Sequence, residues 1–204
     1  MTPPIANTDV SRETLDKLRQ YEDLVRHWTQ RINLISKASV DDLWERHILD
    51  ALQLARFIPP EGGHWMDLGS GGGFPGIVIA IAAQELNPHM RMTLVESDAR
   101  KSVFLRTAVR QFNLNAEVKT TRIEKLPRIR ADVISARALS ALTTLLSYAH
   151  PHMKAGTHCV FPKGTTWKKE VEDARKEWSF SCEITTSETD PNAVILSIGS
   201  LAHV

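Results

Sequence analysis

A glycine-rich segment at residues 65–76, with the sequence WMDLGSGGGFPG, most constrains what this chain can fold into. A short apolar run ends in Asp67, glycines follow from Gly69 onward, and a helical pattern begins after them. Glycine adopts positive φ angles and lets the backbone come close to a ligand. A strand, a turn and a helix in this order present backbone N–H groups and the positive helix end to one crevice of a parallel sheet. The segment therefore predicts a ligand site in an α/β domain.

Short apolar runs alternate with helical segments across residues 61–204, the pattern of βαβ units around a mostly parallel sheet. We expect a Rossmann-like domain with seven strands, of which the last two form an antiparallel hairpin at the sheet edge. The expected strands cover residues 64–68, 91–96, 117–121, 132–135, 157–161, 180–185 and 193–198. The expected helices cover residues 74–85, 99–112, 139–150 and 167–177.

Residues 1–60 precede this alternation and carry two amphipathic helical patterns. The first covers residues 9–33, with Ser11 or Asp9 as its cap, and the second covers residues 39–57, before two prolines end it. We predict that residues 1–60 form a helical extension packed on the main domain.

Composition excludes several classes of protein. The chain has 25 Lys and Arg against 24 Asp and Glu, so it has no global attraction to nucleic acid or to an anionic membrane. It has neither a signal-peptide pattern nor a run near the ~20 apolar residues that span a bilayer, so we expect a cytoplasmic protein. Cys159 and Cys182 lack ligand spacing, so we expect no disulfide and no metal site.

Two carboxylates suggest the nature of the ligand. Glu96 ends the second expected strand, where it can accept hydrogen bonds from both hydroxyls of an adenosine ribose. Asp67 can favour an ammonium or sulfonium charge, and Pro75 crowds the turn that a pyrophosphate needs. These features favour S-adenosylmethionine. A GxGxxG pattern in the same loop also matches the dinucleotide fingerprint, so NAD binding stays open as an alternative.

Beyond this loop, several segments resemble the guanine-N7 methyltransferases of 16S ribosomal RNA, the RsmG (GidB) type. These segments are RINLI at 31–35, RHILDAL at 46–52, LVES at 94–97, RKSVFLR at 100–106, SARA at 135–138 and FPKG at 161–164. Their order and spacing resemble the family's over nearly the whole chain. The sequence departs from the family where Glu96 replaces the commoner Asp, where Leu139 replaces an aromatic residue, and at Pro162 before Lys163.

The resemblance implies a class I methyltransferase fold and S-adenosylmethionine-dependent methylation of guanosine N7 in a loop of 16S rRNA. It also implies cofactor contacts at Gly69, Phe74, Ile123, Glu124 and Arg137. With the loop and strand-end residues added, the predicted cofactor-binding set is Asp67, Gly69, Ser70, Gly71, Phe74, Glu96, Ile123, Glu124 and Arg137. We expect a monomer whose partner is 16S rRNA, either as free RNA or within the small ribosomal subunit, and no membrane.

Chemistry limits what the catalytic residues have to do. The lone pair of guanine N7 is available at neutral pH, so methyl transfer needs no general base. Alignment of nucleophile, methyl carbon and sulfur contributes on the order of 7 to 11 kcal/mol. No Asn-Pro-Pro-Tyr or Pro-Cys segment follows the fourth strand, which argues against an exocyclic amine or a cytosine carbon as target. We therefore predict that Arg137 and Lys163 position the RNA.

Two other functions stay open: an enzyme with a small-molecule or protein acceptor, and a noncatalytic RNA-binding module. Four residues also allow two interpretations. His47 and Asp50, three residues apart on the second helix, either line the site or support helix packing or capping. Trp28 and Trp44 either stack on a base or pack in the core, and their apolar helical faces favour the core.

Overall fold

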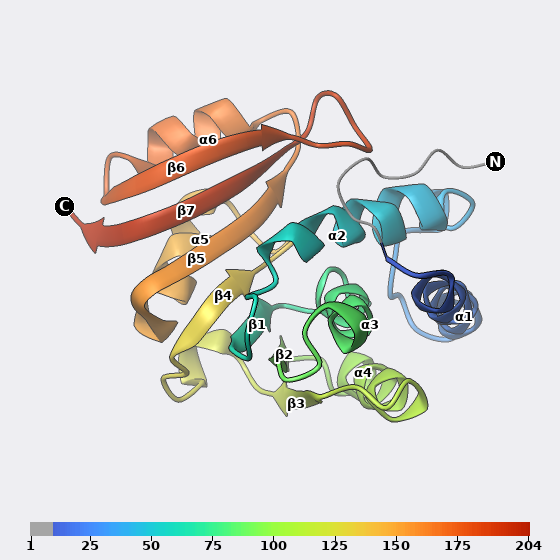
Figure 1. Cartoon of the computed structure of the whole chain (residues 1–204). Helices are drawn as coiled ribbons and strands as arrows, with labels where there is room; N and C mark the ends of the chain where they lie inside the picture. The colour runs from blue at the N-terminus through green and yellow to red at the C-terminus, as the bar shows by residue number, and fades with distance from the viewer. Residues whose placement is uncertain (1–9) are drawn as a thin grey trace.

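The computed structural model describes residues 10–204, so the alternative cap at Asp9 lies outside the described residues. Seven strands form one sheet in the order β3-β2-β1-β4-β5-β7-β6 (Figure 1). The five strands β1 to β5 are parallel, whereas β7 pairs antiparallel with both β5 and β6. The predicted fold, a mostly parallel seven-stranded sheet with an antiparallel hairpin at one edge, is confirmed.

Helices and strands alternate along the sheet as predicted. The strands are β1 (His64–Leu68), β2 (Arg91–Glu96), β3 (Ala116–Thr120), β4 (Ala131–Ser135), β5 (Met153–Lys163), β6 (Trp178–Thr186) and β7 (Val194–His203). The intervening helices and 3-10 turns are α3 (Gly76–Leu86), α4 (Ala99–Gln111), η4 (Ile123–Lys125), α5 (Leu142–Ala149), η5 (His150–His152) and α6 (Trp167–Ala174). Strands β5, β6 and β7 extend beyond their predicted ranges, because backbone pairing continues through largely exposed residues that carry no apolar pattern.

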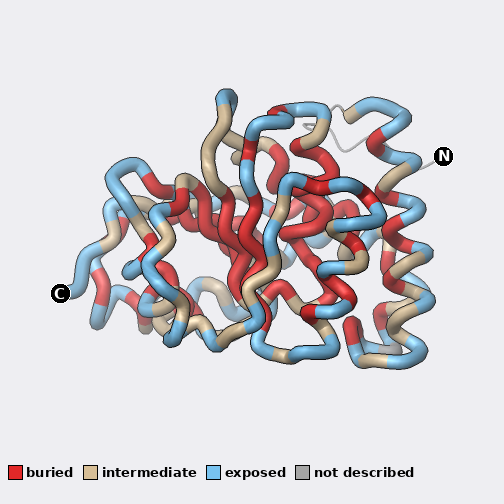
Figure 2. The backbone as a smooth tube through the Cα atoms, turned by 90° about the horizontal axis from the view of Figure 1, so that it is seen from below, coloured by how far each residue is buried: buried red, intermediate tan, exposed pale blue. Residues whose placement is uncertain are grey.

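Two hydrophobic clusters cover the two faces of the sheet. One contains α3, α4 and the N-terminal helix α1 (Arg12–Thr29), and the other contains α5 and α6. Residues 76–83 of α3 are all apolar and buried, because this part of the helix lies between the sheet and the N-terminal helices. Figure 2 shows the buried residues concentrated through the middle of the molecule.

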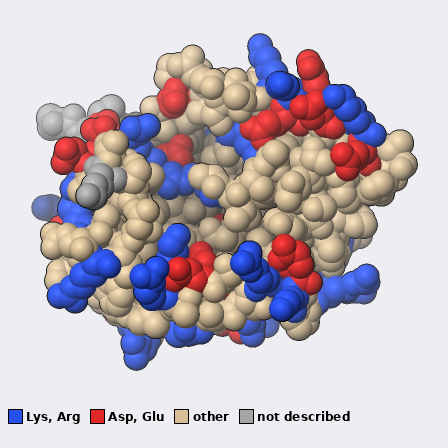
Figure 3. Space-filling view, turned by 180° about the vertical axis from the view of Figure 1, so that it is seen from behind, with Lys and Arg blue, Asp and Glu red and all other residues tan. Residues whose placement is uncertain are grey.

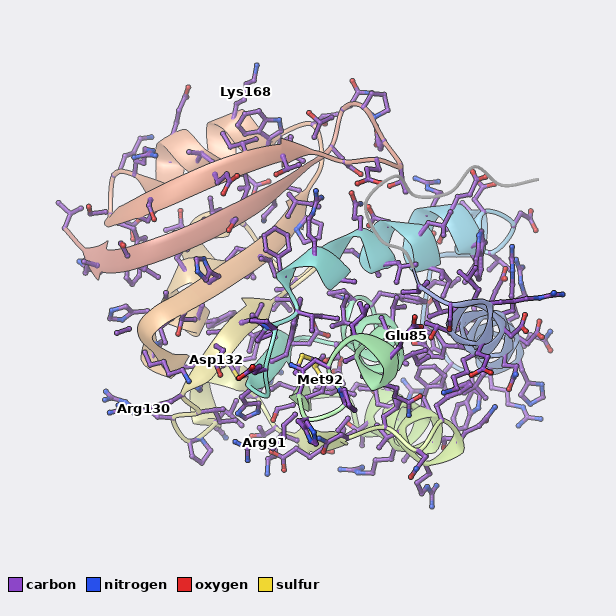
Figure 4. The ribbon with its side chains drawn as sticks, viewed as in Figure 1. Glu85, Arg91, Met92, Arg130, Asp132 and Lys168 are labelled. Atoms are coloured by element: carbon purple, nitrogen blue, oxygen red, sulfur yellow. The ribbon has the colours of Figure 1, made fainter. Side chains whose placement is uncertain are left out.

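The first predicted helix is α1, which is capped by Ser11 and ends at Thr29, short of the predicted end. Its N-terminus is fastened to the end of α3 by Glu85 (Figure 4). The Glu85 carboxylate accepts hydrogen bonds from the Ser11 N–H at 3.0 Å and from the Thr14 hydroxyl at 2.6 Å. Helix α1 is therefore anchored on the main domain at the end remote from the glycine loop.

The prediction of one regular helix over residues 39–57 is wrong. The segment consists of a short turn η1 (Lys37–Ser39), a π-helix η2 (Trp44–Leu49), one α-turn α2 (Asp50–Leu52) and a 3-10 helix η3 (Gln53–Phe57). In η2 the N–H of Asp50 reaches back five residues to the carbonyl of Glu45. Apolar spacing detects helical coiling but does not distinguish these helices, whose hydrogen bonds span three, four or five residues.

The helix after the glycine loop also begins later than predicted, at Gly76 instead of Phe74. Residues 71–75 form turns, and Pro75 occupies the N-cap position instead of the first helical turn. Gly69, Gly71 and Gly73 have positive φ, which helical backbone does not adopt, so the helix can begin only after Gly73.

Candidate active site

The direction of strand addition reverses between β1 and β4, since β2 lies on one side of β1 and β4 on the other. Loops that leave the carboxyl ends of such a pair diverge and open a crevice, where ligands of α/β proteins bind. Two neighbouring hollows of about 280 Å³ and 1000 Å³ open here, and Ala138 and Leu139 after β4 line both of them. We call the smaller one the inner cavity and the larger one the outer groove.

The inner cavity brings together five of the predicted cofactor residues from three separate segments. Gly69 and Gly71 come from the loop after β1, Glu96 from the end of β2, and Ile123 and Glu124 from η4. The parallel register of β1 and β2 places their carboxyl ends side by side, which explains how residues so far apart in sequence meet here.

The Glu96 carboxylate is fixed by backbone donors on both of its oxygens. Its Oε2 accepts the N–H of Gly71 at 2.9 Å, and its Oε1 accepts the N–H of Asp98 at 2.7 Å. Glu96 is only 8% exposed, and the part that is accessible faces the inner cavity. Because each carboxylate oxygen has two lone pairs, both can accept a further hydrogen bond from a ligand hydroxyl.

Leu139 separates the inner cavity from the outer groove. Gly69 has a φ of +64°, and a Cβ at this position would lie 2.6 Å from Leu139 Cδ1. Gly71 has a φ of +53°, and its Cβ would meet only the Gly69 carbonyl oxygen at 3.7 Å, on the cavity side. Any side chain at Gly69 would therefore displace Leu139, whereas one at Gly71 would occupy the inner cavity.

Asp67 and Ser70 do not line either hollow. Asp67 is fully buried beneath the loop, where its Oδ1 accepts the hydroxyl of Ser135 at 2.6 Å. Its Oδ2 has no hydrogen-bond partner among the described residues, and burial raises the pKa of this carboxyl to about 6. The Ser70 hydroxyl donates to the Asp67 carbonyl oxygen at 3.0 Å. The structure thus places both residues below the loop backbone, where they support its shape.

Phe74 is also buried, and it links the loop to the N-terminal helices. Its ring stacks on the His47 imidazole with 5.1 Å between centroids and lies 5.7 Å from the Tyr21 ring. The Tyr21 hydroxyl in turn donates to the Gly72 carbonyl oxygen at 2.5 Å. Tyr21 and His47 therefore hold the glycine loop through Gly72 and Phe74, which do not line the inner cavity.

Arg137 follows β4 and lines the outer groove instead of the inner cavity. Its Nη1 lies 3.0 Å from Asp50 Oδ2 and also donates to the Arg46 carbonyl oxygen at 3.0 Å. Its Nη2 donates to Nδ1 of His47, and its guanidinium carbon lies 5.2 Å from the centre of the Phe74 ring.

His47 can accept this hydrogen bond because its imidazole is neutral. Burial, reinforced by the nearby Arg137 and Arg46 charges, lowers the pKa of His47 to about 4. Its other ring nitrogen, Nε2, has no hydrogen-bond partner among the described residues. Asp50 lines the outer groove and pairs with Arg137, so the site-lining interpretation fits this residue. His47 lines neither hollow and contacts Arg137 and the buried Phe74, so the packing interpretation fits it better.

Lys163, at the end of β5, is the second predicted RNA-positioning residue and also lines the groove. Its ammonium lies 2.8 Å from Glu170 Oε2 and donates to the Ser140 carbonyl oxygen at 2.9 Å. Its side chain is 9% exposed. Arg137 and Lys163 are thus each paired with a carboxylate, and Figure 3 shows acidic and basic side chains interspersed on the face seen from behind.

The sequence patterns missed several residues of the site. Tyr148 and Thr121 line the inner cavity, and Ser187, Thr189 and Asp190 of the β6–β7 turn line the groove. A polar run between two predicted strands signals a turn, but no pattern in it indicates that the turn reaches the site.

Other predictions concern residues away from the two hollows. Trp28 and Trp44 pack against the core cluster around α1, as their apolar helical faces predict. Cys159 is buried in β5, and burial raises the pKa of its thiol to about 12, so a reactive thiolate is disfavoured.

Within residues 10–204, no group of three or more Cys, His, Asp or Glu side chains could hold a metal. No helix in that range has the length and apolar character needed to cross a bilayer.

Comparison with known proteins identifies the family. The sequence model of GidB, the rRNA small subunit methyltransferase G family, matches residues 14–192. The chain belongs to this family. A ribosomal RNA small subunit methyltransferase G from Ruegeria pomeroyi is 51% identical over the full length of both chains. The corresponding Cereibacter sphaeroides protein is 50% identical over 98% of this chain and 97% of its own. The resemblance found in the sequence is confirmed, and it supports S-adenosylmethionine over NAD as the cofactor.

Solved structures support the fold independently of sequence identity. A SAM-dependent methyltransferase from Aquifex aeolicus superposes with a TM-score of 0.59 at 14% identity, covering 77% of this chain and 92% of that one. Aeropyrum pernix fibrillarin, solved with S-adenosyl-L-methionine, gives a TM-score of 0.58 at 18% identity over 76% of this chain and 75% of its own. These likenesses establish that this chain has a class I methyltransferase fold.

Proposed function

We propose that this protein transfers a methyl group from S-adenosylmethionine to N7 of a guanosine in a loop of 16S ribosomal RNA. The observation that carries the proposal is the pair of adjoining hollows on either side of Leu139, in a member of a family named for methylation of small-subunit rRNA. The inner cavity takes the cofactor and the outer groove takes the guanosine.

The residues of the inner cavity suit S-adenosylmethionine. Glu96 accepts hydrogen bonds from the ribose hydroxyls, and Ile123 covers one face of the adenine. The bare backbone at Gly69 and Gly71 leaves room for the amino-acid part, and Asp67 and Ser70 support the loop from below. When bound, S-adenosylmethionine supplies an electrophilic methyl carbon attached to a positively charged sulfur.

The groove residues position the acceptor and do not exchange protons with it. Because guanine N7 has an available lone pair, a base is not needed, and His47 with its lowered pKa stays neutral near pH 7. Arg137 and Lys163 are fixed by Asp50 and Glu170 and donate to guanine O6 or to a phosphate beside the reacting base. These rigidly held donors orient the guanine for attack on the methyl carbon. Proximity and orientation of the reactants lower the barrier by on the order of 7 to 11 kcal/mol.

The remaining features of the proposal concern the whole protein. It acts as a monomer in the cytoplasm on 16S rRNA, presented free or within the small subunit. Residues 10–60 form a helical extension that supports the glycine loop, and residues 61–204 form the cofactor-binding domain. No membrane partner is involved.

Nucleoside mass spectrometry tests the proposed reaction. Small subunits and free 16S rRNA from a strain lacking this activity are incubated with the protein and methyl-labelled S-adenosylmethionine. Labelled 7-methylguanosine is expected with the wild type and is lost with Glu96→Ala, whereas Glu183→Ala on the exposed edge of β6 keeps it. Label in another nucleoside, or in a protein or small molecule alone, would contradict the proposal. Failure to bind the cofactor in calorimetry would favour a noncatalytic RNA-binding module.

A further inference from the structure

A polar bridge crosses one end of the outer groove and joins two distant parts of the chain. The turn after β6 reaches from the edge hairpin toward the helical segment that contains α2 and η3 (Figure 1). At its centre lies Gln53, which is 1% exposed. Its Nε2 donates to Ser187 Oγ at 3.1 Å, and its Oε1 accepts the N–H of Glu188 at 3.0 Å. Gln53 therefore fastens the β6–β7 turn to the N-terminal segment.

The same amide also holds the carboxylate that pairs with Arg137. Gln53 Nε2 donates to Asp50 Oδ1 at 2.9 Å, and this oxygen accepts a second hydrogen bond from the Thr189 hydroxyl at 3.1 Å. The other carboxylate oxygen, Oδ2, forms the 3.0 Å ion pair with Arg137. The Asp50 carboxylate is thus oriented on one side by Gln53 and Thr189 and on the other side by the guanidinium.

We propose that Gln53 is a positioning residue for methyl transfer, because it orients Asp50 and thereby holds the Arg137 guanidinium at the wall of the groove. The inference rests on the function proposed above, since it assumes that Arg137 orients the acceptor. Gln53 contacts neither hollow and acts only through Asp50. A displacement of about 1 Å in a positioning group can cost up to roughly a hundredfold in rate, so a residue behind the groove wall can affect catalysis.

The variant Gln53→Met tests this role, because methionine has nearly the same length and removes both the donor and the acceptor. Its matched control is Gln84→Met. Gln84 links α3 to the carbonyl oxygens of Phe112 and Asn113 at 2.9 and 3.1 Å, away from both hollows. We expect Gln53→Met to lower kcat on 16S rRNA by roughly tenfold to a hundredfold, with a smaller change in the KM for S-adenosylmethionine. Gln84→Met is expected to leave kcat within about twofold.

A double variant distinguishes positioning of Arg137 by Gln53 from a general loss of structure, because only positioning predicts losses of kcat that do not add. If Gln53 acts through Arg137, Gln53→Met should cause no further loss of kcat in an Arg137→Ala background. Independent, additive losses in the double variant would overturn the inference, and so would equal losses of kcat in the two glutamine variants. If Gln53→Met does not fold, Thr189→Val removes the other donor to the same Asp50 oxygen. It should lower kcat a few-fold in the wild-type background and not at all with Arg137→Ala.

A second readout does not depend on the RNA substrate. Because Arg137 contacts His47, the imidazole NMR signals of His47, assigned by their absence in His47→Gln, report the position of the guanidinium. They should shift in Gln53→Met and stay in place in Gln84→Met. If the wild type fails to methylate rRNA, the proposed function fails, but this comparison still decides whether Gln53 holds Arg137. Unchanged His47 signals in Gln53→Met would overturn the inference.

Discussion

Asp67 illustrates how a single residue beneath a binding loop affects stability. Its carboxyl is fully buried, and burial raises its pKa to about 6, partly offset by the Ser135 hydroxyl. The folded protein therefore binds a proton at Asp67 more tightly than the unfolded chain does. The stabilisation from this proton is present below the ordinary aspartate pKa and is lost as the pH rises through about 6.

The variant Asp67→Asn removes this dependence on pH. Relative to the wild type, its free energy of unfolding should increase between pH 5 and pH 8 by about 1 to 3 kcal/mol, since one pKa unit corresponds to ~1.4 kcal/mol. Urea denaturation at the two pH values measures the difference. A wild-type-minus-variant difference that stays constant from pH 5 to pH 8 would show that Asp67 ionises normally in the fold.

At the scale of elements, helix α1 contributes directly to the loop through Tyr21. In Tyr21→Phe the ring still packs against Phe74, but the buried Gly72 carbonyl loses its donor. We expect a stability loss of about 1 to 2 kcal/mol together with a several-fold weaker affinity for S-adenosylmethionine, measured by urea denaturation and calorimetry.

The matched control for Tyr21→Phe lies on the same helix. Thr14→Val removes the hydrogen bond to Glu85, at the end of α1 that is remote from the loop. It should reduce stability by a comparable amount and leave cofactor affinity unchanged. Equal affinities in wild type and Tyr21→Phe would mean that α1 stabilises the domain without shaping the cavity.

Some strands and helices could be predicted from the sequence, and others could not. Strands β1, β2 and β4 are buried on both faces of the sheet, so their apolar runs mark them to within one residue. The helix over residues 39–57 was predicted with the wrong geometry, because the spacing of Leu43, Ile48 and Leu52 fits a π-helix followed by 3-10 turns as well as it fits an α-helix.

For the whole molecule, the inner cavity was more predictable than the groove. Its residues follow the ends of parallel strands, and the topology of the fold brings strand ends together. The groove depends on side-chain pairs such as Arg137 with Asp50 and Gln53 with Ser187, which are 87 and 134 residues apart. Only the folded chain brings these pairs together, because no local pattern encodes a contact between an edge hairpin and an N-terminal segment.

Because the charges of the molecule are largely paired, the affinity for RNA should depend only weakly on salt concentration. The net charge is +1, and the groove cations Arg137 and Lys163 are both paired with carboxylates. Few phosphates should therefore be neutralised on binding. We expect a slope of about −1 to −2 for log K against log salt with a single-stranded rRNA loop, corresponding to ~0.7 per phosphate. A slope steeper than about −5 would point to an extensive basic surface instead.

Removing the carboxylate that pairs with Lys163 should make the dependence of RNA affinity on salt concentration steeper. Glu170→Gln leaves the lysine charge uncompensated while its amide oxygen can still accept the Leu142 N–H, so the cap of α5 is kept. RNA binding should tighten at low salt and its slope should become steeper by ~0.7, the value for one added phosphate contact. The control Glu172→Gln changes the same charge on an exposed site of α6 outside the groove. If both variants steepen the slope equally, net charge alone governs binding, and Lys163 does not contact the RNA.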